Sequence, residues 1–136
     1  MPWKRSSSTA VLHLFQTDSG HRNGGKVTAF ISGPITNRMA RYQYDFADAQ
    51  MVLEFLGYKV LNPAWLPKGL KIEDYVKIDN AMLGCSDLIV LLPGWENSEG
   101  SRKEVELAKS LGIQIIAYKV VKDLAKKEGL FRDGEL

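Results

Sequence analysis

From residue 26 onward, short apolar runs alternate with longer segments in which apolar residues recur every three or four positions. The short runs are typical of strands, and the recurring pattern is typical of amphipathic helices. The pattern predicts strands at residues 27–31, 58–61, 87–92 and 113–118. It predicts helices at about residues 42–56, 72–83 and 101–111, with glycines at positions 57, 84 and 112 as their stops, and a short helix after residue 121.

Four alternations of strand and helix predict an α/β domain with a parallel sheet, helices on both faces and right-handed crossovers. We expect four to five strands in the order 2-1-3-4(-5), by analogy with doubly wound sheets, in which ligands bind where the strand order reverses. That reversal would bring the loop at residues 32–37 beside the loop at residues 93–100.

Residues 1–25 differ from the rest because they are rich in Ser and Gly, and we predict a flexible N-terminal segment there. Residues 26–136 are predicted to form a single domain. The sequence contains no run of 18 apolar residues, so no transmembrane helix is predicted. Residues 1–20 do not resemble a signal peptide. We therefore expect a cytoplasmic protein.

Composition narrows the candidate chemistry. The 18 basic and 16 acidic residues give a net charge of +2, which does not favour binding to duplex nucleic acid. The single cysteine, Cys85, excludes an internal disulfide and is expected to be buried and inert, since it precedes an apolar run. The two histidines, His13 and His21, both lie in the N-terminal segment, so no metal site is predicted.

Asp79 is a candidate functional residue because it stands where the apolar stripe of the second helix requires an apolar residue. It follows Ile72 by seven positions and Val76 by three. Carboxylates are seldom buried unless they are paired or hydrogen-bonded. Asp79 therefore lines a polar pocket or meets a partner, or else the helix is turned and Asp79 lies at an exposed edge; both interpretations stay open.

Glu104 also has two interpretations. Ser101 and Glu104 have the spacing of a capping box, in which the glutamate reaches back to the first turn of the helix. Alternatively, the loop delivers Glu104 to the crevice, where a carboxylate can attack an anomeric carbon. Backbone N–H groups of Gly100 and Ser101 could then hold a phosphate or a sugar hydroxyl.

The two loops at the expected crevice carry further candidates. Gly33 allows close backbone approach, and the hydroxyls of Ser32 and Thr36 could hold a ligand, although a simple turn explains them equally well. Neither a GxGxxG motif nor a P-loop is present, so ordinary dinucleotide or ATP binding is not predicted. Trp95 could stack on a base, close the pocket or contact another subunit, and Tyr42 packs in the core or faces the site.

Three sets of residues, in this order and spacing, resemble the nucleoside 2-deoxyribosyltransferase superfamily, which includes nucleoside 5'-monophosphate N-glycosidases. The sets are Phe30-Ile31-Ser32-Gly33-Pro34-Ile35, Asp79 ahead of Cys85-Ser86-Asp87-Leu88-Ile89-Val90, and Ser98-x-Gly100-x-x-x-Glu104-x-x-x-Ala108 followed by Gly112. The resemblance covers about residues 26–119 and is nearest to small phage and prophage members.

The resemblance implies a flavodoxin-like (Rossmann-like) sheet and a glutamate nucleophile for the C1' carbon, which corresponds to Glu104. It implies that Asp79 assists the base or orients the sugar, and that Ser98 contacts a 5'-phosphate. The turn after the first strand would line the sugar site with Ser32, Gly33, Pro34 and Ile35. It implies no metal or organic cofactor, and a homodimer or larger homo-oligomer in which a neighbouring subunit completes the site.

The chain departs from the superfamily pattern in two places. Phe30 stands where active members tend to have a tyrosine that supports the nucleophile, so that support is missing or comes from Tyr42 or Tyr44. Arg102 and Lys103 precede the glutamate, where they could keep it ionised or pair with it and block it.

Three functions remain after these observations. The first is an enzyme, a transferase or a hydrolase, that acts through Glu104 on the N-glycosidic bond of (deoxy)nucleosides or their 5'-monophosphates. The second is a non-catalytic domain that binds or senses a nucleotide in the same pocket. A weaker third is a protein-interaction domain that uses Trp95. The small-molecule functions require that Asp79 and Glu104 lie close together.

Overall fold

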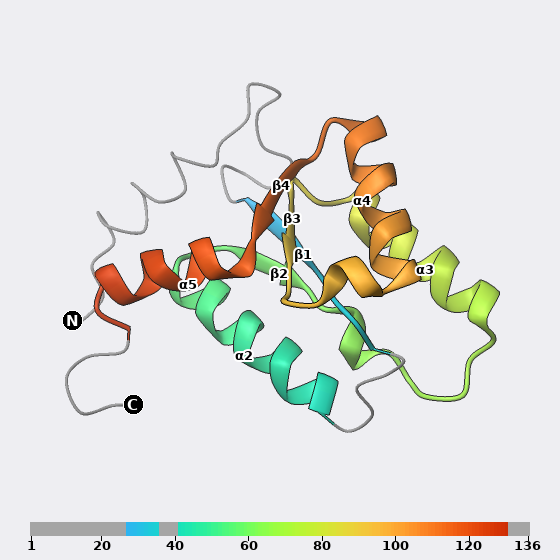
Figure 1. Cartoon of the computed structure of the whole chain (residues 1–136), viewed down its shortest axis with the longest axis horizontal. Coiled ribbons are helices and arrows are strands. Elements are labelled where there is room, and N and C mark those ends of the chain that lie inside the picture. The colour runs from blue at the N-terminus through green and yellow to red at the C-terminus, as the bar shows by residue number, and fades with distance from the viewer. Residues whose placement is uncertain (1–26, 36–40, 131–136) are drawn as a thin grey trace.

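Four parallel strands form the centre of the structure (Figure 1). The computed structural model of the chain describes residues 27–35 and 41–130. The strands are β1 (Thr28–Ser32), β2 (Lys59–Leu61), β3 (Leu88–Leu91) and β4 (Gln114–Ala117). Their order is β2-β1-β3-β4, with Phe30 of β1 opposite Leu61 of β2 and Ile89 of β3. The predicted α/β fold and the predicted order of these strands are confirmed.

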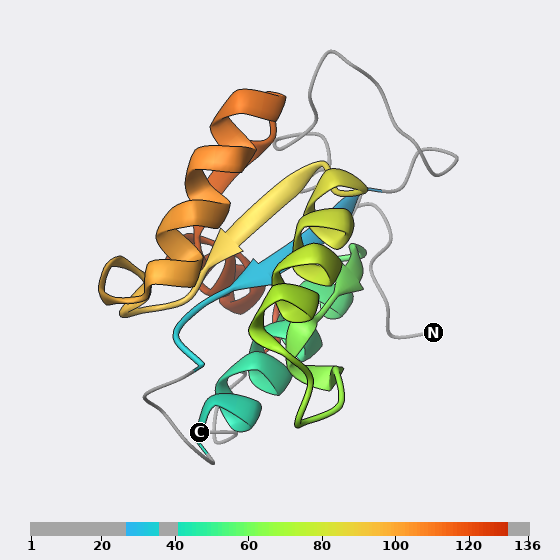
Figure 2. The same cartoon turned by 90° about the vertical axis from the view of Figure 1, so that its right-hand side faces the viewer.

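Helices cover both faces of the sheet (Figure 1). They are α2 (Arg41–Phe55), α3 (Ile72–Gly84), α4 (Glu99–Leu111) and α5 (Tyr118–Lys127), with short 3₁₀ helices η1 (Pro63–Trp65) and η2 (Trp95–Asn97). Helices α2 and α5 pack together on one face, and α3 and α4 pack together on the other. Figure 2 looks at the molecule from the side of α3 and α4.

The alternation of side chains along the strands divides the buried apolar residues into two cores. Ala29 and Ile31 of β1 face α2 and α5, whereas Phe30 faces α3 and α4. Because side chains of a strand alternate between faces, Ser32 at the end of β1 lies on the same face as Phe30. The larger core lies between the sheet and the pair α2 and α5, and the smaller one lies under α3 and α4.

The loops after β1 and β3 meet at the carboxyl edge of the sheet, as the expected crevice requires. The Leu92 N–H donates to the Ser32 carbonyl at 2.9 Å. Gly33 is buried there, and a Cβ at this position would lie 2.8 Å from the Cβ of Leu92. Only a glycine permits this approach, so Gly33 fixes how closely the two loops come together. Thr36, in the same loop, lies outside the described residues.

Three sequence expectations were wrong in detail. Tyr118 begins α5 instead of ending the last strand, because its side chain is buried in the core beside α2. Cys85 is exposed because it forms the C-terminal cap of α3, outside the core. Ile72 and Val76 are 78% and 47% exposed.

The exposure of Ile72 and Val76 follows from the way α3 packs. This helix reaches the smaller core through Met82 and Leu83 near its C-terminal end. The apolar residues of its first two turns therefore remain outside that core.

The predicted N-terminal segment, residues 1–25, lies outside the described residues. Among the helices of residues 41–130, none is both long enough and apolar enough to cross a bilayer.

Candidate active site

Glu104 points from α4 toward the end of β1, where it meets a buried serine. The Ser32 hydroxyl oxygen lies 2.6 Å from Glu104 Oε1 and 2.9 Å from the Ser101 hydroxyl oxygen. Ser32 and Ser101 are 1% and 2% exposed. A strand and a helix thus hold three side-chain oxygens in contact at the carboxyl edge of the sheet.

Asp79 reaches the same cluster from α3. Its carboxyl group is in hydrogen-bond contact with that of Glu104. Its Oδ1 atom is buried and has no hydrogen-bond partner among the described residues. Two carboxyl groups can form such a bond only if one of them carries a proton, because ionised carboxylates only accept. The structure therefore brings Asp79 and Glu104 together, as the small-molecule functions require.

Burial changes the ionisation of both acids. Burial, together with the smaller effect of the neighbouring Asp79, raises the pKa of Glu104 to about 8 against the opposing hydrogen bond from Ser32. Burial also raises the pKa of Asp79 to about 6, and here the hydrogen bond from Glu104 acts in the opposite direction. The two groups titrate as a pair, and both shifts favour a proton shared between them.

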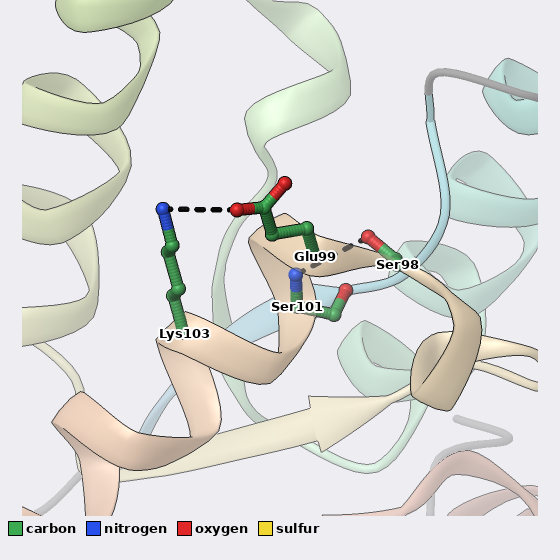
Figure 3. A network of polar contacts seen from close by, with 4 residues as sticks. All are labelled: Ser98, Glu99, Ser101 and Lys103. Atoms are coloured by element: carbon green, nitrogen blue, oxygen red, sulfur yellow. Dashed lines mark hydrogen bonds and ion pairs between the residues drawn. The ribbon is translucent and has the colours of Figure 1, made fainter.

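Glu104 is not a capping residue of α4, whose N-terminus is drawn in Figure 3. The helix begins at Glu99, and its cap is Ser98, whose hydroxyl oxygen accepts a hydrogen bond from the Ser101 N–H at 3.2 Å. Glu104 consequently lies in the second turn, beyond the reach of a capping box. The capping interpretation of Ser101 and Glu104 was wrong because the helix starts earlier than the sequence pattern predicted.

The basic residues before Glu104 make other contacts. Lys103 forms an exposed ion pair with Glu99 at 3.3 Å (Figure 3). Arg102 donates to the Glu96 carbonyl at 2.7 Å. Both side chains lie on the solvent side of α4. They therefore do not form the ion pair with Glu104 that could have blocked it.

The side chain that contacts Glu104 is Ser32, and not one of the two candidate tyrosines. The ring of Tyr42 packs edge-to-face on Phe46 at 6.2 Å, against the core on the α2 and α5 side. Tyr44 is 76% exposed. The structure does not bring Tyr42 or Tyr44 to Glu104, whereas Ser32 donates a hydrogen bond to it.

The other predicted site residues divide between the two sides of the sheet. Trp95 packs against the smaller core, on the side of Glu104, and Gly100 is exposed in the first turn of α4. Ile35 packs against the larger core. Pro34 lines a cavity on that opposite side with Pro93.

This cavity has a volume of about 190 Å³ and lies away from the acidic pair. Its polar side chains satisfy one another: the Tyr118 hydroxyl donates to Asp48 at 2.6 Å, and Lys122 lies 3.8 Å from the same carboxylate. Pockets for small molecules usually measure about 300–1,000 Å³. The cavity is smaller than that, and we assign it no ligand.

Sequence analysis missed the contact between Ser32 and Glu104. A signal for it exists, because Ser32 follows the apolar Phe30 by two positions in a strand, and residues two apart share a face. A serine on that face, beside a helix that carries a glutamate, could have been proposed as its partner.

Comparison with known proteins gives one match. A family model described as "Domain of unknown function (DUF4406)" matches residues 27–117. Neither the curated proteins nor the solved structures gave a match. Within the described residues, no group of three or more His, Cys, Asp or Glu side chains is arranged to hold a metal ion.

Proposed function

We propose that this protein, which belongs to the DUF4406 family, cleaves or transfers the N-glycosidic bond of (deoxy)nucleosides or their 5'-monophosphates, with Glu104 as nucleophile. One observation carries the proposal: Asp79 and Glu104 form a partly buried pair of carboxyl groups in hydrogen-bond contact, which requires a proton on one of them. The pair lies at the carboxyl edge of a parallel sheet, where doubly wound folds bind ligands. The resemblance of the three residue sets to nucleoside deoxyribosyltransferases supplies the substrate class.

The first half of the reaction uses the proton of the pair. Transfer of this proton from Glu104 to Asp79 along their hydrogen bond leaves an ionised nucleophile beside a neutral acid. A Glu104 oxygen attacks C1' of the sugar, and the bond between C1' and the base nitrogen breaks. The electron pair goes to the base, which takes the proton from Asp79 as it leaves.

The second half restores the pair. A water molecule attacks C1', the bond between C1' and Glu104 breaks, and Asp79 takes the proton released by the water. If a second base attacks instead, the protein is a transferase. Inverting glycosidases keep their two carboxyl groups about 6.5–9.5 Å apart so that a water fits between them. Retaining glycosidases, which form a covalent intermediate, keep theirs about 5–5.5 Å apart, so a close pair of carboxyl groups favours the covalent route.

The start of α4 is the proposed site for a 5'-phosphate. Ser98 caps this helix and Gly100 lies in its first turn, where the first N–H groups have no partners within the helix. Such helix N-termini favour anions through both their N–H groups and the helix dipole. This position favours a monophosphate substrate, and hence a hydrolase.

One observation favours the alternative, a domain that binds a nucleotide without turnover. The raised pKa of Glu104 keeps this carboxyl group neutral near pH 7. A neutral carboxyl group is a hydrogen-bond donor as well as an acceptor, which suits recognition of a base or a sugar.

Base release separates the two functions. The protein is incubated with deoxynucleosides and their 5'-monophosphates, with and without an added acceptor base, and free and exchanged bases are followed by chromatography. We expect release that disappears in Glu104→Gln but persists in Glu106→Gln. The control glutamate lies on the same helix, with its side chain 76% exposed. Nucleotide binding without release from any substrate would refute the enzyme and leave the binding domain.

A further inference from the structure

Four side chains from three elements form a continuous line of oxygens. Ser101 of α4 contacts Ser32 of β1 at 2.9 Å, and Ser32 contacts Glu104 at 2.6 Å. The line ends where Glu104 meets Asp79 of α3. Because a strand and two helices contribute, the tertiary fold holds the line in place.

The protons available to these side chains determine the direction of the hydrogen bonds along the line. The Ser32 hydroxyl has one proton, so it can donate to Glu104 or to Ser101 but not to both. The shorter contact, 2.6 Å to Glu104, falls in the range of a charge-assisted O–H···O⁻ bond. When Ser32 donates to an ionised Glu104, Ser101 must donate to Ser32, and the 2.9 Å contact fits a neutral bond.

Protonation of Glu104 allows a second arrangement of these bonds. A protonated Glu104 that donates to Ser32 leaves Ser32 free to donate to Ser101, whereas one that donates to Asp79 can still accept from Ser32. The direction of the bond between the two serines thus depends on the group to which Glu104 donates.

We propose that Ser32 is the positioning residue of this site: oriented by Ser101, it donates to Glu104 and thereby favours the ionised form that attack on C1' requires. The role of Ser32 in the attack on C1' rests on the proposed function. The line of hydrogen bonds through Ser32 does not depend on that function. In this chain Ser32 takes the place of the strand tyrosine that Phe30 replaces.

The charged groups around Glu104 do not favour its ionised form, so we assign this effect to Ser32. Among the described residues, Asp79 of α3 is the ionisable group that acts on Glu104, and it opposes ionisation. On α4 itself, Arg102 and Lys103 are exposed and contact other groups. The neighbouring β1 contributes Ser32, which carries no charge. The hydrogen bond from Ser32 is therefore the described interaction that opposes burial and Asp79.

The test measures the ionisation of Glu104 directly, without requiring activity. The full chain is labelled with carbon-13 at its carboxyl carbons, and the signal of Glu104 is assigned by its loss in Glu104→Gln. Its titration is compared in the parent protein, Ser32→Ala, Ser101→Ala and Ser86→Ala. Ser86 is the matched control because it is also 1% exposed, and its hydroxyl donates to the Met82 carbonyl, away from the pair.

We expect Ser32→Ala to move the Glu104 titration upward by about one pH unit or more, since a hydrogen bond to the ionised group is lost. Ser101→Ala should shift it less and in the same direction, and Ser86→Ala should not shift it. Where base release is detected, Ser32→Ala should lose about tenfold at neutral pH and recover as the pH rises. A purely structural role would lower activity equally at every pH.

An unchanged Glu104 titration in Ser32→Ala would overturn the proposal, whether or not the protein is an enzyme. If Ser32→Ala does not fold, Ser32→Cys replaces it, because a thiol has nearly the same size and is a weak donor. Absence of base release together with the expected shift would refute the proposed function and leave the role of Ser32 intact.

Discussion

The two faces of the sheet hold their acidic side chains in different environments. Under α2 and α5, Asp48 accepts from Tyr118 and lies near Lys122, so its charge is compensated. Under α3 and α4, Asp79 and Glu104 share a space in which burial raises the pKa of both. One buried oxygen of Asp79 also lacks a partner among the described residues.

The two faces also differ in the size of their apolar cores. Buried polar groups that are satisfied rigidify a fold, whereas unsatisfied ones cost free energy and are retained where chemistry needs them. The larger apolar core lies on the face where Asp48 contacts Tyr118 and Lys122. The smaller core lies beside the acidic pair. The face under α2 and α5 therefore stabilises the domain that holds the strained face in position.

The largest expected effect on stability comes from the face under α2 and α5, where the charge of Asp48 is compensated. Tyr118→Phe removes the 2.6 Å hydrogen bond to Asp48. Because this bond involves a charged group, we expect the free energy of unfolding to fall by about 1.5–3 kcal/mol, measured by urea denaturation. Tyr44→Phe, at a tyrosine that is 76% exposed, is the matched control and should change little. Equal stability of Tyr118→Phe and the parent protein would show that the hydrogen bond to Asp48 does not stabilise the face under α2 and α5.

The acidic pair under α3 and α4 should make the free energy of unfolding depend on pH. The pKa of Glu104 is raised from 4.5 to about 8 in the folded protein, so its stabilising contribution is complete below pH 4.5 and is lost as the pH rises through 8. Asp79, raised from 3.8 to about 6, acts in the same direction. We expect the free energy of unfolding to fall by on the order of 2 kcal/mol over this range, a figure reduced because the pair is only partly buried.

Glu104→Gln should flatten this dependence, because it removes the group with the larger shift. Urea denaturation at pH 5 and at about pH 8.5 compares the variant with the parent protein, and Glu106→Gln serves as the control at an exposed glutamate. A decline in Glu104→Gln as steep as in the parent protein would show that the acidic pair is not the strained group.

The sequence predicted the sheet and its helices well because short apolar runs and helical periodicity are local signals. It failed at Tyr118, where a strand passes directly into a helix without a turn residue to mark the change. Asp79 was identified correctly as an anomaly, but the stripe that contains Ile72 is exposed, since only the C-terminal end of α3 reaches the core.

The candidate site was harder to predict because it depends on contacts between distant elements. The bond between Ser32 and Glu104 joins residues 72 positions apart. Nothing local distinguishes a serine that ends a strand from one in a turn. The capping spacing of Ser101 and Glu104 also arose by coincidence, because the cap at Ser98 already starts the helix. Local patterns therefore gave the two acids and Ser32 as candidates, but not the bond between Ser32 and Glu104.

The smallest expected effect concerns the solvent side of α4. Lys103 and Glu99 form an ion pair one turn apart, with both side chains more than 70% exposed (Figure 3). Such pairs contribute about 0.3–0.5 kcal/mol, and salt screens them. Lys103→Ala should therefore lower stability by no more than that in urea denaturation at low salt, and the difference should vanish at high salt. It should also leave the Glu104 carboxyl titration in place, because Lys103 points away from the acidic pair. A shift of that titration would mean that charge on the outer side of α4 reaches Glu104, and the ionisation of Glu104 would then depend on more than burial, Asp79 and Ser32.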